Sequence, residues 1–379
     1  MSNTVMFSGL EAFGQENRMY LMGIAAVIAV IGIVRAIMIS RGESVDSKEM
    51  TKDLAEFPVQ LGSVGPVELE KYNLRDFYIA SSLNSCCSKG GQMYTYASTD
   101  ALKNVIKQGA RALDFEIFTV DGKPVISAST SSNSNYVKAT LNSVPFDEAM
   151  LTVRNYCFSS GFVQNYRDPV IINLRMSTGI DVYDSMAKSI KSAFCGSDQR
   201  DNCKHLLHKK HKHDADGYNI GAMKMSELQG KVIIFCTGSE SIYRNKPDFY
   251  DLVSGSASSV FLRQLSHYDV LYGAGNDPDL INYNKKNMSA VIAAPGEDTT
   301  IAASTPLYYG CQMVFMDYSN TDNNLAFLLS KFNKAGTAFI LRPKSQRYIP
   351  IVVRPPTPQN PELSYKPATM SKPYFTANI

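Results

Sequence analysis

Two acidic residues stand close together in one apolar run of the sequence. In ARALDFEIF, Asp114 and Glu116 are two positions apart, so in an extended strand both side chains point to the same face. Neighbouring carboxylates in apolar surroundings repel each other and need a cation, which is either a metal ion or a basic side chain. Asn84, which follows an earlier apolar run, would complete three oxygen ligands of the kind that Ca²⁺ prefers.

The sequence also supplies a basic side chain for these carboxylates. Arg175 lies near the end of the apolar run PVIINLRM, and a guanidinium group can bind carboxylates through paired hydrogen bonds. If the two runs form neighbouring strands, Arg175 would neutralise Asp114 and Glu116 without a metal. We therefore expect an ion pair and no bound metal, and Ca²⁺ held by Asn84, Asp114 and Glu116 is the alternative.

Eight short runs rich in Val, Ile and Phe are predicted to form the strands that position these residues. They cover residues 76–82, 110–118, 123–129, 169–176, 231–238, 288–295, 311–318 and 337–343. Segments with helical spacing lie between several of them, at 99–109, 146–158, 182–194 and 323–336, and Gly336 is expected to cap the last. Alternating strands and amphipathic helices predict parallel strands, and eight of them predict an α/β fold of the (β/α)8 TIM-barrel type.

One N-terminal segment has the composition of a transmembrane helix. Residues 19–40 are apolar except for Arg35 and the end of the segment, which is close to the length needed to cross a bilayer. A cleaved signal peptide would have a basic start and a shorter apolar core, and a buried core helix is the other alternative. The C-terminal flank carries more basic residues, namely Arg35, Arg41, Lys48 and Lys52 against Arg18. This bias predicts a single-pass anchor with the following domain in the cytosol.

Composition and cysteine usage exclude several classes of protein. Hydrophobic residues make up 44% of the chain and charged residues 19%, which is typical of a folded protein. The net charge of +3 is too small to indicate nucleic-acid binding. The seven cysteines are scattered, and Cys86 and Cys87 are adjacent. We expect free, mostly buried thiols in a reducing compartment rather than a disulfide framework.

Two further segments could carry a function. Residues 204–217 hold four of the five histidines, and His208, His211 and His213 could capture a metal. The lysines between them repel a cation, so we favour a solvated basic loop. The tail from Pro355 is rich in proline and contains a PxxP spacing at Pro358 and Pro361, which could dock a protein partner.

Several of these segments resemble phosphoinositide-specific phospholipase C. SSLNS, GARALDFEIFTVDGKPVIS, DPVIINLRMS and ELQGKVIIF are similar to the X half of its catalytic barrel, and GCQMVFMDYS with KFNKAGTAFILRP is similar to the Y half. The resemblance covers roughly residues 75 to 343. It implies an X-like half-barrel at 73–238, a connection at 239–284 and a Y-like half-barrel at 285–347. The composition of the remaining chain adds an N-terminal segment at 1–18, an anchor at 19–40, a linker at 41–72 and an extended proline-rich tail at 348–379.

The resemblance also shows what this chain lacks. Family members use two histidines as acid/base groups, and those positions hold Leu83 and Ala128 here. A positioned acid/base residue contributes about 10²–10⁴ in rate, so the resemblance implies negligible activity. An active phosphodiesterase with rearranged chemistry, using His267 or a loop histidine, is the alternative.

The ligand-binding positions are changed as well. Asn84, Asp114 and Glu116 match the family's calcium ligands, but the fourth ligand position, a glutamate in the family, holds Arg175. The positions of the family's phosphate-binding lysines and arginine hold Phe235, Thr237 and Ala290. We therefore expect no cofactor, with calcium as the alternative, and a degenerate pocket formed by Asn84, Asp114, Glu116 and Arg175.

These observations predict a membrane-anchored pseudoenzyme with a structural or binding role. Its expected partners are the membrane, through the N-terminal helix, and proteins, through the barrel surface and the tail. A module that binds phosphoinositide headgroups without turnover is a second alternative. An anchored, inactive barrel with two extended ends would also suit a membrane-containing assembly, and the virion of a large DNA virus is the setting that we hypothesise.

Overall fold

The computed structural model describes most of the chain. The described residues are 18–89, 94–129, 138–195, 203–207, 217–237, 240–257, 259–272, 277–293, 301–350, 355–356, 358, 367 and 369–378. The chain divides into two units, Met1–Arg347 and Tyr348–Ile379.

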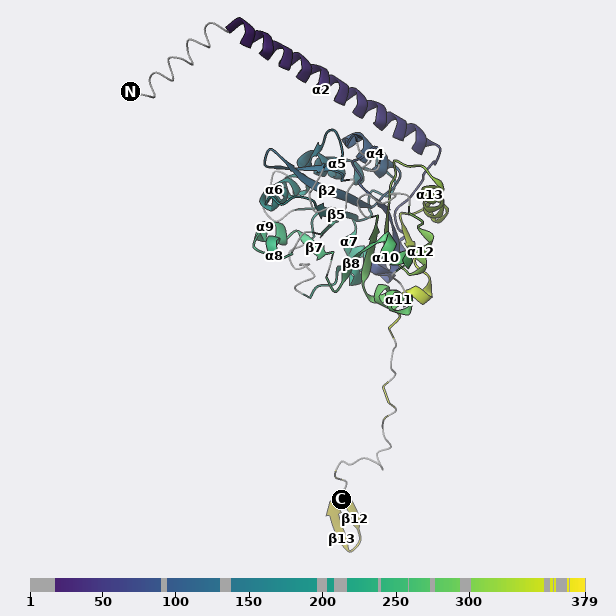
Figure 1. The fold of residues 1–379 in the computed structure, drawn as a ribbon. Helices are drawn as coiled ribbons and strands as arrows, with labels where there is room; N and C mark the ends of the chain where they lie inside the picture. Colours follow the sequence, from purple (N-terminus) through teal and green to yellow (C-terminus); the bar gives the residue numbers. More distant parts are fainter. Residues whose placement is uncertain are drawn as a thin grey trace, which may run out of the picture. The chain divides into compact units, whose positions relative to one another are not determined.

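Eight parallel strands of the first unit form a nearly closed barrel, surrounded by helices (Figure 1). Their order is β7-β6-β5-β2-β1-β10-β9-β8, and the ladder is open between β7 and β8. The strands are β1 (Phe77–Ser82), β2 (Ala112–Val120), β5 (Val170–Met176), β6 (Val232–Cys236), β7 (Val253–Ser256), β8 (Leu262–Ser266), β9 (Met288–Ile292) and β10 (Met313–Met316). This confirms the predicted α/β barrel, whose carboxyl strand ends we call the mouth.

Two of the eight predicted strands are not part of the parallel barrel. The run at 123–129 forms β3 (Lys123–Ser127), which pairs antiparallel with β2, and the run at 337–343 forms β11 (Phe339–Leu341), which pairs antiparallel with β1. The turn between β2 and β3 is Asp121-Gly122, both with positive φ. A two-residue connection is too short for a parallel crossover and forms a hairpin instead. β3 also pairs with the short β4 (Val144–Pro145).

The barrel is completed by two strands that the sequence pattern does not reveal. β7 and β8 have the sequences VSGS and LRQLS, which lack the Val- and Ile-rich composition of the other strands. The predicted number of strands was therefore right, but two of their assignments were wrong.

The four predicted helices are present and cover the barrel. They are α4 (Thr99–Lys107), α5 (Phe146–Cys157), α6 (Tyr183–Phe194) and α13 (Asn323–Ala335). Gly336 ends α13 in the left-handed conformation with φ 70°, as expected for a C-cap glycine. The other helices of the barrel unit are α3 (Pro66–Lys71), α7 (Met225–Leu228), α8 (Glu240–Tyr243), α9 (Pro247–Tyr250), α10 (His267–Tyr272), α11 (Asp277–Lys286) and α12 (Ser304–Tyr308), with 3₁₀ turns η1 (Leu74–Asp76), η3 (Ile220–Ala222) and η4 (Lys344–Gln346).

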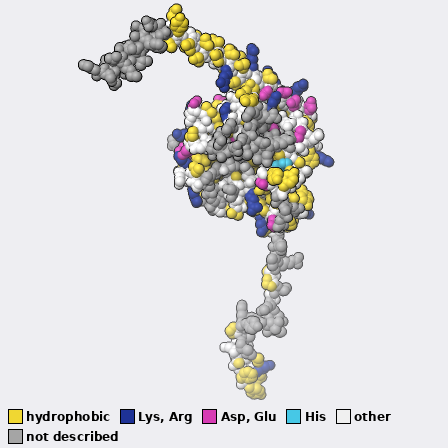
Figure 2. Space-filling view, viewed as in Figure 1, with side chains coloured by type: hydrophobic (Ala, Val, Ile, Leu, Met, Phe, Trp, Pro, Cys, Tyr) yellow, Lys and Arg dark blue, Asp and Glu magenta, His cyan; other side chains and the backbone are white. Residues whose placement is uncertain are grey.

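The N-terminal helix α2 (Arg18–Ala55) is longer than the predicted anchor. Among the described residues, it is the helix that is long and apolar enough to cross a bilayer. Figure 2 shows hydrophobic side chains along its N-terminal half. Residues 41–55, which we expected in a linker, continue the helix, and the side chains of Ser47, Met50 and Leu54 are buried.

The second unit contains a short hairpin that was not predicted. β12 (Thr369–Lys372) and β13 (Phe375–Asn378) pair antiparallel at the end of the tail. Lys372 pairs with Phe375, so Pro373 and Tyr374 form the turn.

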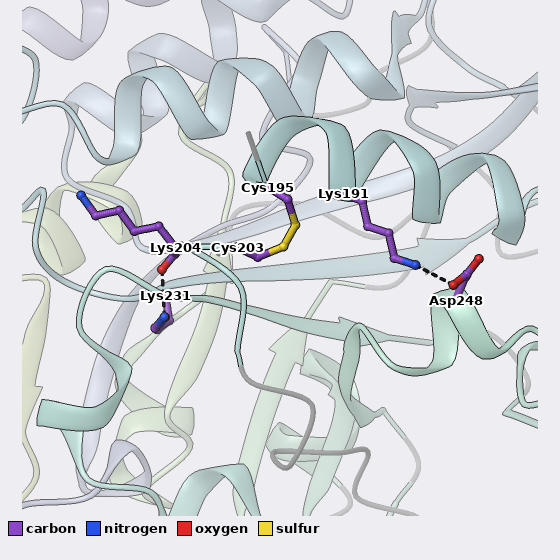
Figure 3. Close-up of a disulfide and its surroundings, with 6 residues drawn as sticks. All are labelled: Lys191, Cys195, Cys203, Lys204, Lys231 and Asp248. Atoms are coloured by element: carbon purple, nitrogen blue, oxygen red, sulfur yellow. Dashed lines mark hydrogen bonds and ion pairs between the residues drawn. A yellow bond between two sulfur atoms is a disulfide. The ribbon is translucent and has the colours of Figure 1, made fainter. Parts of the chain in front are cut away.

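The cysteines correct one prediction. Cys195 and Cys203 form a disulfide (Figure 3), with Cα atoms 4.1 Å apart. Cys195 directly follows α6, and the segment from Cys203 lies beside the start of β6, where Leu206 pairs with Val232. This spatial proximity is invisible in the scattered sequence pattern. The other five cysteines are free and buried, as expected. Because disulfides are typical of oxidising compartments, the cysteines no longer support a cytosolic orientation.

A buried acid at the opposite end of the barrel from the mouth makes stability depend on pH. Asp168 precedes β5, is fully buried, and its Oδ1 accepts a hydrogen bond from the Val64 N–H at 3.0 Å. Burial raises the pKa of Asp168 to about 6, although the Val64 N–H and nearby Arg111 oppose the shift.

We expect this carboxyl group to destabilise the fold as the pH rises. The pKa of Asp168 in the folded state lies above the value of about 3.9 for an unfolded Asp. Its contribution to the free energy of unfolding is therefore full below pH ~4 and is lost as the pH rises through about 6. Relative to Asp168→Asn, the wild type should lose about 3 kcal/mol of unfolding free energy between pH ~4 and ~7. Urea unfolding of both proteins across this range measures the difference, and a constant difference would contradict the prediction.

Candidate functional site

Four predicted site residues meet at the mouth of the barrel. Asn84 follows β1, Asp114 and Glu116 lie on β2, and Arg175 lies near the end of β5. β2 and β5 are parallel neighbours, and Glu116 is in register with Arg175. The parallel pairing therefore brings the two carboxylates and the guanidinium together, as the sequence predicted.

Arg175 is the centre of this cluster. Its Nε donates to Asp114 Oδ1 at 2.9 Å, and its Nη2 donates to Asp114 Oδ2 at 2.9 Å. The same Nη2 donates to Asn84 Oδ1 at 2.5 Å, and Nη1 lies 3.3 Å from Glu116 Oε2. Burial acts to lower the pKa of Arg175, but Asp114 and Glu116 outweigh it and raise the pKa above its ordinary value. The guanidinium therefore stays charged and binds all three oxygen-bearing side chains.

The remaining hydrogen-bonding capacity of Asp114 is also used. Asn173 Nδ2 donates to Asp114 Oδ1 at 2.8 Å, and the Asn84 N–H donates to Asp114 Oδ2 at 3.1 Å. Asn84 has a φ of 43°, a left-handed conformation that asparagine tolerates better than most residues. The turn after β1 thus presents both its backbone and its side chain to the cluster.

Glu116 is held by two serine hydroxyls that the sequence analysis missed. Ser129 Oγ and Ser177 Oγ each donate to Glu116 Oε1 at 2.6 Å, and the Ser129 N–H donates to Oε2 at 3.0 Å. Burial acts to raise the pKa of Glu116, but Arg175 and these donors outweigh it, so the pKa is lowered. The carboxylate is ionised and fully engaged inside the protein.

Comparison with known families identifies the first part of the barrel. Residues 71–236 match the family model described as phosphatidylinositol-specific phospholipase C, X domain. The match covers less than half of the chain. No curated protein sequence gives a significant match to the chain.

Solved structures support the same fold for the whole barrel. Phospholipase C PLC21 of L. pealei has a TM-score of 0.53 and 16% identity, and PLC21 of S. officinalis has 0.52 and 16%. Each match covers 73% of this chain and 38% of the other chain. The chain thus spans well under half the length of these relatives, and what it shares with them at this identity is the fold. The structure is a phospholipase C-like barrel.

The two positions that the sequence resemblance assigns to the family histidines, Leu83 and Ala128, hold apolar side chains. Leu83 is 4% exposed and its N–H donates to Met316 O at 2.8 Å, and Ala128 is fully buried. Neither residue can accept or donate a proton. His267 lies at the start of α10, directly after β8, which is three strands from β1 in the sheet order.

The positions that the sequence resemblance assigns to the family's phosphate-binding residues, Phe235, Thr237 and Ala290, carry no charge. Phe235 and Ala290 are buried in β6 and β9. The Thr237 hydroxyl accepts from the Met176 N–H at 3.2 Å and donates to Leu174 O at 3.3 Å, so it is engaged with the backbone of β5.

The oxygen-bearing side chains at the mouth of the barrel are not arranged to bind calcium. The three side chains that the resemblance assigns as calcium ligands, Asn84, Asp114 and Glu116, all contact the Arg175 guanidinium. A divalent cation would have to displace or oppose that permanent positive charge. Within the described ranges, no three His, Cys, Asp or Glu side chains are grouped to hold a metal ion.

The histidine-rich loop is only partly described. His205 Nδ1 forms a hydrogen bond with Gly230 O at 2.8 Å, and its ring stacks on Phe158 with centroids 4.3 Å apart. This histidine packs against the barrel. His208, His211 and His213, the predicted metal-capture alternative, lie outside the described residues.

Proposed function

We propose that this chain is a membrane-anchored, catalytically degenerate phospholipase C-like protein with a structural or binding role. The observation that carries the proposal is the Arg175 ion pair with Asp114 and Glu116 at the place of the family's cation site. The absence of an imidazole at both family histidine positions, Leu83 and Ala128, supports it.

The complete hydrogen bonding of this cluster supports a role in stabilising the fold. Every carboxylate oxygen of Asp114 and Glu116 accepts at least one hydrogen bond from a neighbouring group. An interior ion pair of this kind is stable only when its geometry and hydrogen bonds are complete. The polar residues at the mouth thus neutralise one another, which suits a barrel that is retained for its shape.

The anchor rests on α2. Its N-terminal half is exposed along its length in the isolated protein, and a hydrocarbon environment would cover this apolar surface. The barrel surface and the proline-rich tail are then available to protein partners. The setting in the virion of a large DNA virus stays a prediction, which co-purification of the protein with assembled particles would test.

Hydrolysis of phosphoinositides should be absent. Full-length protein reconstituted into vesicles that contain phosphatidylinositol or its phosphates should release no more inositol phosphate than protein-free vesicles, with or without Ca²⁺. Losing even one positioned acid/base group costs about 10²–10⁴ in rate, and both are missing here. An active phospholipase C added to the same vesicles serves as the positive control.

Two outcomes would favour the alternative functions. Reproducible Ca²⁺-dependent release that Asp114→Ala abolishes would establish an active phosphodiesterase with rearranged chemistry. Tight, phosphoinositide-dependent binding to vesicles without release, weakened by Arg175→Ala, would indicate a headgroup-binding module.

A further inference from the structure

The long helix α2 has two halves of different character. Residues 18–40 are exposed and mostly apolar, whereas the second half has a buried stripe formed by Ser47, Met50 and Leu54. Arg41, Lys48 and Lys52 are exposed, and at 100° per residue they lie on the opposite side of the helix from that stripe. The second half is therefore an amphipathic helix of the barrel, continuous with the apolar segment.

Hydrogen bonds along α4 fix the direction of this second half. Ser47 Oγ lies 2.8 Å from the Oγ of Ser98, the N-cap of α4. One turn further, Asn104 Nδ2 donates to Thr51 Oγ1 at 2.8 Å. At the end of α4, Gln108 Nε2 donates to Leu54 O at 2.9 Å. Contacts therefore advance together along both helices, and α2 and α4 run side by side in the same direction.

The direction of α4 relates α2 to the two ends of the barrel. α4 begins at the mouth, where the Ser98 N–H donates to Cys86 O at 2.7 Å in the turn after β1. It ends at the opposite end, from which the chain enters β2. Near the start of the packed half, Glu43 Oε2 accepts from Asn142 Nδ2 at 3.2 Å, in the loop after β3. These contacts place the apolar half of α2 beyond the mouth end of the barrel. Figure 1 shows that the N-terminal half of α2 runs clear of the barrel.

We propose that α2 is a rigid strut that holds the mouth of the barrel toward the surface of the membrane that its apolar half crosses. The inference rests on the anchor in the proposed function and adds the face of the barrel that meets the lipid. At 1.5 Å per residue, the three residues from Ser40 to Glu43, where the first barrel contact forms, span about 5 Å beyond the apolar segment. That distance is comparable to the thickness of the headgroup region, so the mouth end of the barrel faces the lipid headgroups.

The two ends of the barrel offer matched labelling sites. Val120 is 40% exposed at the tip of the β2–β3 hairpin, which extends past Glu116 on the mouth side. Val67 is 69% exposed on α3, which leads through η1 into the start of β1 at the opposite end. The five free cysteines are buried and the other two are bonded, so an engineered Val→Cys thiol is the reactive one.

The test compares Val120→Cys and Val67→Cys in the full-length protein. Each variant carries a thiol-linked fluorophore and is reconstituted into phosphatidylcholine and phosphatidylserine vesicles with nitroxide-labelled headgroups in both leaflets. We expect several-fold stronger quenching at position 120 than at position 67. Equal quenching, or stronger quenching at 67, in protein that floats with the vesicles would overturn the strut orientation and leave the anchor intact. Protein that does not float would contradict the anchor itself, and the orientation with it.

A second pair of variants tests the packed half of α2. Met50→Asp places a charge on the buried stripe, whereas Val45→Asp places the same charge on the exposed face. In the Val120→Cys and Val67→Cys backgrounds, Met50→Asp should reduce the quenching difference and Val45→Asp should preserve it. An unchanged difference with Met50→Asp would show that the contact with α4 does not set the orientation.

Discussion

Replacing Arg175 by alanine is expected to lower the free energy of unfolding by about 3–5 kcal/mol, because it leaves the Asp114 and Glu116 carboxylates buried without a cation. Both acids are almost completely excluded from solvent, at 0% and 1% exposed. Urea unfolding or calorimetry of wild type and Arg175→Ala measures the loss. Exposed Arg154 provides a matched control, since Arg154→Ala should change stability by no more than about 0.5 kcal/mol.

A triple variant separates the charge from the loss of packing. Arg175→Ala combined with Asp114→Asn and Glu116→Gln removes both negative charges and leaves the same cavity as the single variant. We expect it to regain much of the lost stability, because neutral amides can share hydrogen bonds with Asn84, Asn173 and the nearby serines. If the single and triple variants were equally unstable, the cost would lie in packing and the ion pair would contribute little.

The sequence predicts the barrel, and it predicts the ion pair of Arg175 with Asp114 and Glu116 at the mouth, for identifiable physical reasons. A spacing of two residues places Asp114 and Glu116 on one face of a strand, and parallel neighbours bring their carboxyl ends together. This is sufficient to predict that Arg175 would meet both acids. Asn173 lies two residues before Arg175 and so shares its face of the strand. The sequence did not predict its role, because an uncharged amide does not require a partner of opposite charge.

Other features depend on contacts that sequence periodicity does not encode. Ser129 and Ser177 are ordinary small polar residues until the fold brings them to Glu116. The strands VSGS and LRQLS form because the neighbouring barrel strands leave exposed edges for them, not because of their own composition. The Asp121-Gly122 dipeptide between two apolar runs is the sequence signal that residues 123–127 return antiparallel.

The same reasoning explains the disulfide and the length of α2. Cys195 and Cys203 are eight residues apart, and only the placement of the second beside β6 brings their sulfur atoms together. The mixed polar composition of residues 41–55 favours a linker in sequence. Their buried stripe forms only because α4 provides a partner surface.

Arg175→Ala is also expected to gain calcium binding that the wild type lacks. The oxygens now bound by the guanidinium, Oδ1 of Asn84, Oδ2 of Asp114 and Oε2 of Glu116, would face a vacated and negatively charged space. Ca²⁺ accepts carboxylate and amide oxygens and completes its shell with water. At a Ca²⁺ concentration about 100 times the dissociation constant, binding would stabilise the variant by about 2.7 kcal/mol. The triple variant, which has the same cavity and no carboxylates, is the control.

The central claim is that Arg175 takes the place of a cation at the mouth of this phospholipase C-like barrel. Its most direct test is calorimetric unfolding of the wild type, Arg175→Ala and the triple variant across a Ca²⁺ titration. We predict that the melting temperature rises with Ca²⁺ for Arg175→Ala alone and stays constant for the other two proteins. A specific rise for the wild type, absent with Mg²⁺ and abolished by Asp114→Asn, would show that the native site binds calcium and would contradict the account.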